Sequence, residues 1–443
     1  MMTQAPSEFR RKGWSVPGRY KLTAFVGSGA NGQVALAMDN ETKKKVAIKR
    51  VELENGLVVA REVRLLRELR GHANLLQLQT VLPPTTPDFK EIYIVTEALD
   101  ADMTKLFEQP EQLIGHHLLW FSYKLLQAVA VLAAKGIVHR DIKPSNIFLT
   151  ESCNLSLGDF GLARALSDTS PLGQPLRKSG GDTGRPQTQH VCTRYWRGPE
   201  VLLMTSYSSV SPSRSSGTAG RTPRASDAPP EEEPTPVAKP PKYGPPLDMW
   251  SVGCVVFELF GMLVPLAERK GTLFPGDYST LSPPGEGGRP MAAHNIRHDQ
   301  LGMIIRVLGA PCPGKPVDAK NNWAAVADEV AVYNPVAARF IRLASGKERT
   351  EEEQQTFWKK RLPGVSDELR GLFLSMVCFR PEERITAAEA LRHPCFDSVR
   401  SPRDAEELAR ATVVEDFGDV SDLRALLCAE IAASNPGWSF ESK

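Results

Sequence analysis

The chain has 443 residues, of which 41% are hydrophobic and 24% charged, so it can bury a large core and is not disordered throughout. Its 54 basic and 52 acidic side chains leave a net charge of only +2, far from the strong positive charge of a protein that lives on nucleic acid. Its seven cysteines include no Cys-x-x-Cys pair, which disfavours a zinc site and fits a reducing compartment.

The sequence gives no sign of membrane insertion. The N-terminal residues lack the apolar run of a signal peptide. The most apolar stretch, residues 249–266, is interrupted by Glu258 and Pro265, which predicts a buried core helix and not a membrane span. We therefore expect no nucleic-acid partner and no membrane partner.

Short Val- and Ile-rich runs separated by Gly, Asn and Asp predict an antiparallel sheet between residues 20 and 96. These runs are KLTAFVG, QVALAMD, KVAIKRV and EIYIVTE. One helix with an apolar stripe is predicted at 57–70. After residue 102, long helical patterns dominate, such as those at 117–135, 247–260 and 299–308. A small β-rich region thus precedes a larger helical one, which defines an α+β protein.

Three stretches have the composition of flexible surface insertions. They lie at about 167–187, 205–246 and 276–293, and all are rich in Gly, Ser or Pro. In the second, 18 of the 42 residues are Ser or Pro. A segment of this composition has too few apolar side chains to offset the entropy lost on ordering.

A glycine-rich segment fits the pattern G-x-G-x-x-G-x-V between two predicted strands. Such glycines let a hairpin backbone lie close over a triphosphate, although glycine-rich hairpin turns without a ligand are also common. The predicted phosphate-binding residues are Val26, Gly27, Ser28, Gly29, Ala30, Asn31, Gly32, Gln33 and Val34.

Lys49 lies within an otherwise apolar strand. It faces solvent if the strand simply alternates, whereas a buried ammonium needs an anion. Glu62, on the helix that follows, offers this anion, and the pair would hold Lys49 toward phosphate oxygens.

A carboxylate base and two metal ligands occur in the run from His139 to Asn146 and the later Asp159-Phe160-Gly161. Asp141 can accept the proton of an attacking hydroxyl, and Lys143 can meet the charge of the transferring group. Asn146 and Asp159 supply the hard oxygen ligands that Mg²⁺ prefers. An Asp in a turn more often caps backbone N–H groups, but these motifs occur together and in order.

That order resembles a eukaryotic protein kinase over about residues 20–396. The resemblance implies a bilobal fold with an antiparallel-sheet N-lobe (20–97), a hinge (98–102) and a large, mainly helical C-lobe (103–396) that contains the three insertions. Residues 1–19 would form an N-terminal extension, and 397–443 a C-terminal extension that packs back on the kinase core. ATP and Mg²⁺ are the implied cofactors.

Further segments are similar to mitogen-activated protein kinases. They are VPGRY before the glycines, DFGLAR, VCTRYWRGPEVLL, LFPGDY, LGMIIRVLGAP, and VVEDFGDVSDLRALLCAEIAA after HPCF. The resemblance implies a serine/threonine kinase that prefers Pro after its target residue, an upstream activator of the MAP kinase kinase type, phosphatases, a monomer, and a location in the cytoplasm and nucleus. The alternative is a pseudokinase or scaffold that binds ATP and partners without phosphotransfer.

The resemblance also assigns roles around the nucleotide. Thr96 would be the gatekeeper, and Glu97 and Leu99 would bind adenine through their backbones. Asp102 would lie near the ribose. Two supports complete the set: Asp248 would brace the catalytic loop, and Glu200 would pair with Arg384.

The activation lip departs from the family. The family has Thr-x-Tyr where this chain has Thr188-Gln189-His190, so the phosphorylatable tyrosine is missing and Thr188 remains. The resemblance places Arg61, Arg140 and Arg164 around a phosphate on Thr188, whereas Arg194 and Arg197 would meet the unphosphorylated His190. The acidic docking patch of the family is also reduced, since Asp404 alone stands at a matching acidic position. The segment around Asp404 is therefore interpreted equally well as a docking site or as the solvated start of a helix.

Overall fold

The computed structural model describes residues 9, 13–29, 32–53, 56–109, 111, 113–166, 194–205, 244–277, 298–414 and 423–438. The predicted insertion at 167–187 lies outside the described residues, as do 206–243 of the second and 278–293 of the third. The predicted end of the second insertion, residue 246, lies two residues too far along the chain, because the helix α6 (Pro245–Gly261) begins at Pro245. The chain divides into two compact units. One comprises 1–169, 255–271 and 385–443, and the other comprises 170–254 and 272–384.

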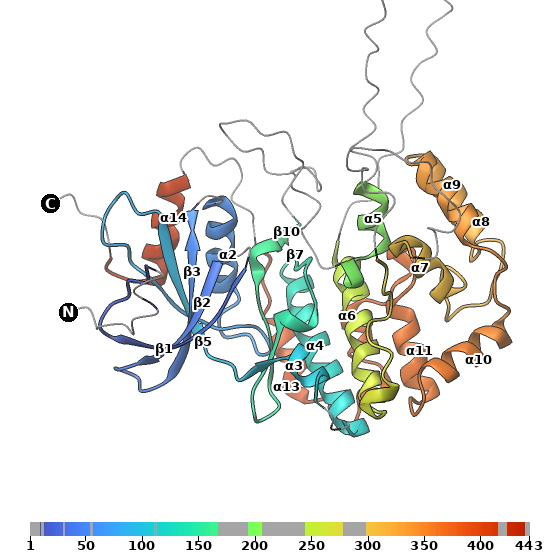
Figure 1. Ribbon diagram of the computed structural model, residues 1–443, viewed down its shortest axis with the longest axis horizontal. Helices are drawn as coiled ribbons and strands as arrows, with labels where there is room; N and C mark the ends of the chain where they lie inside the picture. Colours follow the sequence, from blue (N-terminus) through green and yellow to red (C-terminus); the bar gives the residue numbers. More distant parts are fainter. Residues whose placement is uncertain are drawn as a thin grey trace, which may run out of the picture. The chain divides into compact units, whose positions relative to one another are not determined.

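The first unit begins with a five-stranded antiparallel sheet in the order β1-β2-β3-β5-β4 (Figure 1). Its strands are β1 (Tyr20–Gly29), β2 (Gly32–Asp39), β3 (Lys45–Glu52), β4 (Leu78–Leu82) and β5 (Glu91–Glu97). All four predicted strands are present, and β4 is added at the edge. Because side chains alternate between the two faces of a strand, Ala35, Ile48 and Val95 are buried in one cluster on the same face.

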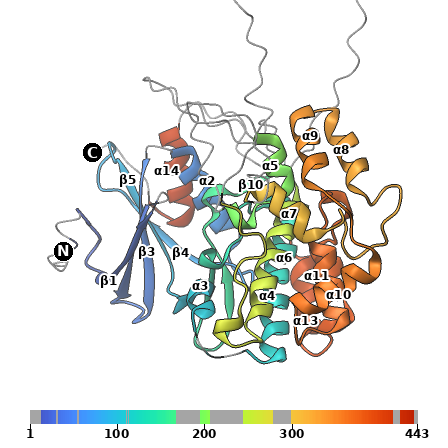
Figure 2. The same ribbon diagram turned by 45° about the vertical axis from the view of Figure 1, so that its right-hand side comes forward.

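Two helices from opposite ends of the chain lie side by side beside this sheet. The helix α2 (Gly56–Glu68) buries Leu65 and Leu66 of the predicted stripe together with Val59 and Val63, whereas Val58, which was also predicted in the stripe, is only partly buried. The helix α14 (Leu423–Ser434) packs against α2 and contacts β4 (Figures 1 and 2). The C-terminal segment thereby lies on the N-terminal half of the same unit.

The helix α4 (Gly115–Ala134) forms the centre of the unit's helical part. Leu125, Leu126 and Leu132 on it are fully buried. Among the described residues it is the one helix long and apolar enough to cross a membrane, but 67% of its most apolar window is buried inside the fold, as in a core helix. The other helices of the unit are α3 (Met103–Phe107), α12 (Ala387–Ala390) and α13 (Pro402–Ala409).

Two small antiparallel sheets hold the loops that contain the sequence motifs. The first has the order β6 (Ala101–Asp102), β8 (Ile147–Leu149), β9 (Leu155–Leu157), and the second pairs β7 (Ile137–Val138) with β10 (Arg164–Ala165). The segment 139–146 therefore runs between β7 and β8, and the segment 158–163 between β9 and β10. Both loops are anchored at each end by strand pairing.

The second unit is helical, and local capping defines several of its helices. It contains α5 (Pro199–Thr205), the part of α6 up to residue 254, α7 (Gln300–Leu308), α8 (Trp323–Ala331), α9 (Pro335–Ala344), α10 (Glu351–Arg361) and α11 (Asp367–Met376). Asp299 caps α7 by accepting hydrogen bonds from the N–H groups of Leu301 and Gly302. Thr350 and Glu353 form a capping box at the start of α10. Together with the sheet, these helices confirm the α+β class.

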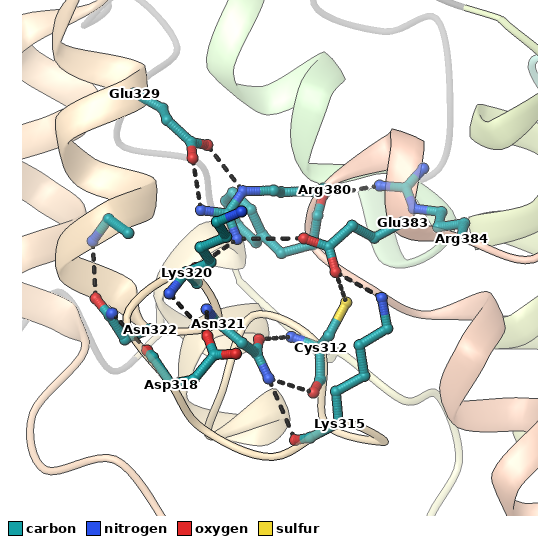
Figure 3. Close-up of polar contacts among 12 residues, drawn as sticks. Cys312, Lys315, Asp318, Lys320, Asn321, Asn322, Glu329, Arg380, Glu383 and Arg384 are labelled. Carbon is teal, nitrogen blue, oxygen red and sulfur yellow. Dashed lines mark hydrogen bonds and ion pairs between the residues drawn. The ribbon is translucent and has the colours of Figure 1, made fainter.

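A polar network holds the loop between α7 and α8 in this unit (Figure 3). The Asn321 amide bonds the backbone of Cys312, Lys315 and Pro316. Glu383 Oε2 accepts from Cys312 Sγ at 3.1 Å and from Lys315 Nζ at 2.8 Å. The contact to Cys378, with burial and Glu383, raises the pKa of the Cys312 thiol, so this cysteine stays protonated and serves as a hydrogen-bond donor.

Candidate active site

Lys49, in β3, is the centre of a buried charge cluster. Its Nζ lies 2.5 Å from Glu62 Oε1 and 3.4 Å from Asp159 Oδ1. Burial would lower the pKa of Lys49, but the two carboxylates outweigh it and raise the pKa above its usual value. Lys49 is therefore charged at neutral pH, and the solvent-facing alternative does not apply, since only 17% of its side chain is exposed.

The predicted catalytic residues meet in the loop between β7 and β8. Asp141 Oδ2 accepts from Lys143 Nζ at 2.7 Å and from Asn146 Nδ2 at 3.0 Å. Asn146 Nδ2 also donates to the Asp141 carbonyl at 2.8 Å. These contacts fix the carboxylate of Asp141, which is 6% exposed, beside a cation that can meet negative charge.

A buried histidine, for which the sequence predicted no role, connects this loop to the Asp-Phe-Gly segment. The ring of His139 contacts the Gly158 carbonyl through Nε2 at 3.0 Å and accepts from the Asp141 N–H at 3.3 Å. It also lies against the ring of Phe160, with centroids 5.1 Å apart. The motif His-Arg-Asp could have drawn attention to this histidine. Its hydrogen-bond partners could not be predicted, because they are backbone groups that a sequence pattern does not reveal.

Two motif residues have a left-handed backbone that non-glycine residues rarely adopt. Arg140 has a φ of 70° and Asp159 a φ of 61°. Such conformations cost energy and persist where the surrounding structure enforces them, often at functional sites. Here they turn the chain directly before Asp141 and at Asp159.

Asn146 and Asp159 are suited to hold a divalent cation together with phosphate. The N–H of Gly158 donates to the Asn146 carbonyl at 3.0 Å, which brings the two segments side by side. Because the Asn146 amide nitrogen binds Asp141, its Oδ1 is oriented as the remaining acceptor. No group of three or more His, Cys, Asp or Glu side chains among the described residues could hold a metal ion alone. An amide oxygen and a carboxylate are hard donors of the kind that a divalent cation such as Mg²⁺ takes together with phosphate and water.

The glycine-rich segment forms the hairpin between β1 and β2. Gly32 has a φ of +116°, and a Cβ there would lie 2.4 Å from the Arg50 carbonyl, so glycine is required at this position. Val26 is 59% exposed on β1, open to cover a ligand. Ala30 and Asn31 lie outside the described residues.

The predicted adenine and ribose residues lie at the end of β5 and just after it. Thr96 is buried, as a gatekeeper would be. Glu97 is held by the Gln77 N–H at 3.0 Å, and burial raises its pKa. Leu99 is partly exposed. Asp102 caps α3 by accepting from the Lys105 N–H at 3.2 Å.

The predicted regulatory residues are described only in part. Arg61 is buried on α2, and Arg164 lies on β10. Thr188, His190, and the side chains of Arg194 and Asp404 lie outside the described residues. Arg197 is partly exposed after a 3₁₀ turn.

The two predicted supports lie in the second unit. Arg384 Nη1 and Nη2 bond the two oxygens of Glu200 at 2.7 and 2.8 Å. Asp248 is 1% exposed in the first turn of α6.

Residues 20–217 match the family model described as the protein kinase domain. The chain is 28% identical to the Dictyostelium discoideum extracellular signal-regulated kinase 1 over 88% of its own length and 57% of that protein. It is 27% identical to the Saccharomyces cerevisiae mitogen-activated protein kinase KSS1, covering 91% of this chain and 89% of KSS1. It is also 27% identical to the Schizosaccharomyces pombe mitogen-activated protein kinase spk1, covering 86% and 79%.

With the geometry above, these matches support a protein kinase. Its similarity to mitogen-activated protein kinases extends over most of its length, which confirms the predicted resemblance. Together these findings support a serine/threonine protein kinase that is similar to the mitogen-activated type.

Proposed function

We propose that the chain transfers the γ-phosphate of ATP to Ser or Thr of protein substrates, in a signalling cascade of the MAP kinase type. One observation carries the proposal: Lys49, Glu62 and Asp159 form one charge cluster, and Asp141, Lys143 and Asn146 form another, with His139 and Gly158 between them. Phosphoryl transfer is mainly positioning and charge stabilisation, which two such clusters supply.

Each residue has a distinct part in this proposal. Asp141 accepts the proton of the substrate hydroxyl. Lys143, which is hydrogen-bonded to the Asp141 carboxylate, stabilises the negative charge that develops on the transferred phosphoryl group. Lys49, kept charged and oriented by Glu62, holds the phosphates. When bound at Asn146 and Asp159, Mg²⁺ would neutralise phosphate charge.

We further propose that the kinase prefers Pro after its target residue and is activated through Thr188 alone. The support is the resemblance of residues 191–203 to the family's activation segment, and His190 in place of the phosphorylatable tyrosine. Substrates with Ser/Thr-Pro sites, an upstream kinase, phosphatases, and a location in cytoplasm and nucleus belong to the same proposal.

Replacing Asp141 tests the proposed transfer. Because Asp141→Asn removes the base, we expect a fall in phosphotransfer of about 10²- to 10⁴-fold, measured with a generic basic substrate and with a peptide library. Lys49→Met should also lower turnover by orders of magnitude. Asp397→Asn, which alters an exposed carboxylate of the same unit, is the control and should remain active.

Full activity of Asp141→Asn would overturn the proposal. ATP binding without transfer by the wild type would favour the pseudokinase alternative. A library without enrichment of Pro after the target residue would overturn the substrate preference alone.

Thr188→Ala tests the proposed switch. A phosphate adds roughly 1.5 to 2 negative charges, and each charge-assisted contact to an arginine is worth about 1.5–3 kcal/mol. We therefore expect Thr188→Ala to lose most activity in enzyme isolated from cells, whereas His190→Ala retains the switch. Equal activity of Thr188→Ala and wild type would mean that another event activates the kinase.

A further inference from the structure

Residues that precede the first strand cover one face of the N-terminal sheet. Phe9, Trp14 and Val16, here called the N-terminal cap, are 2%, 5% and 6% exposed. The rings of Phe9 and Trp14 meet edge to face, with centroids 6.0 Å apart, and Trp14 lies 5.6 Å from Tyr93 of β5. The cap is thus part of the hydrophobic core on that face.

The cap bonds one strand of the glycine-rich hairpin directly and shares a hydrophobic cluster with the other. Trp14 Nε1 donates to Gln33 Oε1 at 3.0 Å, and Gln33 directly follows Gly32 in the motif. On the other strand, Phe25 lies two residues before Gly27 and packs against the same core cluster. The capped core cluster therefore reaches both strands of the hairpin, and Trp14 bonds the second strand directly.

A second set of contacts leads from the cap to the strand that contains Lys49. The N–H of Ser15 donates to the Tyr93 hydroxyl at 3.1 Å, and this hydroxyl donates to Glu91 at 2.6 Å. Glu91 in turn accepts from Arg50 Nε at 2.7 Å. Arg50 follows Lys49 and is the register partner of Gln33, so both sets of contacts end on one cross-strand pair.

The hairpin is open at its first two glycines. Among the described residues, a Cβ added at Gly27 or Gly29 would meet no atom within 4 Å. Successive side chains alternate between the two faces of a strand. Contacts that fix Gln33 and Arg50 on the capped face therefore also fix the positions of Val34 and Lys49 on the other face.

We propose that the N-terminal cap positions the glycine-rich hairpin and Lys49 for nucleotide binding, with the hydrogen bond from Trp14 to Gln33 as its main contact. Trp14 is a positioning residue, since it acts through Gln33. The role in nucleotide binding rests on the proposed kinase function.

Hydrogen exchange of the full-length protein without nucleotide tests the cap directly. Trp14→Phe keeps an aromatic ring but removes the indole N–H, and Gln33→Met removes the acceptor. Each should speed exchange of the backbone amides at 24–36 by about two- to tenfold, the factor that one net hydrogen bond supplies. Because the two residues share one bond, the double variant should match the single variants.

Thr42→Val is the matched control. It removes the hydrogen bond from Thr42 to Asp39 at the opposite end of the β2 strand. It should lower the thermal midpoint without faster exchange at 24–36. If Trp14→Phe speeds exchange over the whole sheet equally, or the control affects the hairpin as much, the cap is only structural and the proposal fails.

A second measurement addresses the nucleotide. Trp14→Phe should raise both the Kd of Mg-ATP, measured by calorimetry, and the KM for ATP by about two- to tenfold, with kcat changed less than about twofold. An unchanged Kd with faster exchange would overturn the positioning role. Absence of phosphotransfer in the wild type, with the exchange and Kd results as expected, would count against the proposed function and not against the cap.

Discussion

Asp39, at the end of β2, is an almost fully buried carboxylate held by several donors. Arg19 bonds both of its oxygens at 2.8 and 2.7 Å, and the Glu41 N–H and the Thr42 hydroxyl donate to it as well. The Arg19 hydrogen bond is the main reason why the pKa of Asp39 lies well below its usual value, although burial opposes the shift. The ionised form is therefore favoured in the folded protein.

This shift predicts how stability depends on pH. A carboxylate whose pKa is depressed on folding contributes stability above its unfolded pKa of about 3.9, and this contribution is lost as the pH falls toward the folded pKa. We expect Asp39→Asn to be less stable than wild type at pH 7 and to lose less stability between about pH 5 and pH 2. Urea unfolding at several pH values in this range measures the free energy of unfolding of both proteins. Parallel curves of this free energy against pH would contradict the expectation.

At the scale of single residues, the sequence predicted which candidate site residues lie together better than it predicted the groups around them. Asp141, Lys143 and Asn146 lie within six consecutive residues, so the motif itself brought them together. The pairing of Lys49 with Glu62 required a helix to pack against a strand, which alternation alone does not determine. The link through His139 could not be predicted, because it joins a side chain to the backbone of Gly158.

At the scale of elements, the contact between α14 and α2 bears on Glu62. Arg67 Nη1 lies 2.8 Å from Glu430 Oε2, and Asn435, just beyond α14, donates to the Val81 carbonyl of β4 at 2.7 Å. Burial raises the pKa of Glu430, although Arg67 opposes this. The C-terminal helix thus braces the helix that presents Glu62.

Removing the Glu430 carboxylate should loosen α2. The Arg67 side chain is 27% exposed and can regain water, so we expect Glu430→Ala to cost about 1–2 kcal/mol of unfolding free energy, less than a fully buried pair. Hydrogen exchange should become faster in α2. Glu406→Ala breaks an exposed pair with Arg410 and should have almost no effect. If both variants behaved alike, the contact would contribute nothing.

Long, periodic elements were predictable, whereas short or highly charged ones were not. The helices α4 and α6 differ from their predicted ranges by one or two residues at each end. The edge strand β4 has only five residues, too few for a clear period. The helix α10 begins with three glutamates and ends with three basic residues, so its polar sequence lacks an apolar stripe and only the capping box indicates its start.

At the scale of the whole molecule, distant parts of the sequence meet in the second unit through one buried ion pair. Arg384 and Glu200 are 184 positions apart, and their side chains are 0% and 5% exposed. Gly198 is needed beside them, since a Cβ there would lie 2.6 Å from Glu200 Oε2. No local pattern predicts such a contact. It was predicted from the family resemblance alone.

The two partners of this pair should differ in what their loss costs. Arg384 also donates to the carbonyls of Cys378, Phe379 and Pro246, so Arg384→Met leaves three acceptors and a buried carboxylate without their donor. We expect a loss of about 3–5 kcal/mol for Arg384→Met and about 1–3 kcal/mol for Glu200→Gln, which keeps a hydrogen-bonding side chain of the same shape.

Urea unfolding of both variants measures this difference, with Lys315→Met, which breaks a more exposed contact to Glu383, as the control. The double variant Glu200→Leu/Arg384→Met should recover only part of the loss, because the carbonyls stay unsatisfied even when the charges are gone. Full recovery would mean that the carbonyl contacts contribute little and that the pair acts through charge alone. Equal losses of unfolding free energy for Arg384→Met and Glu200→Gln would contradict the expected difference between the two partners.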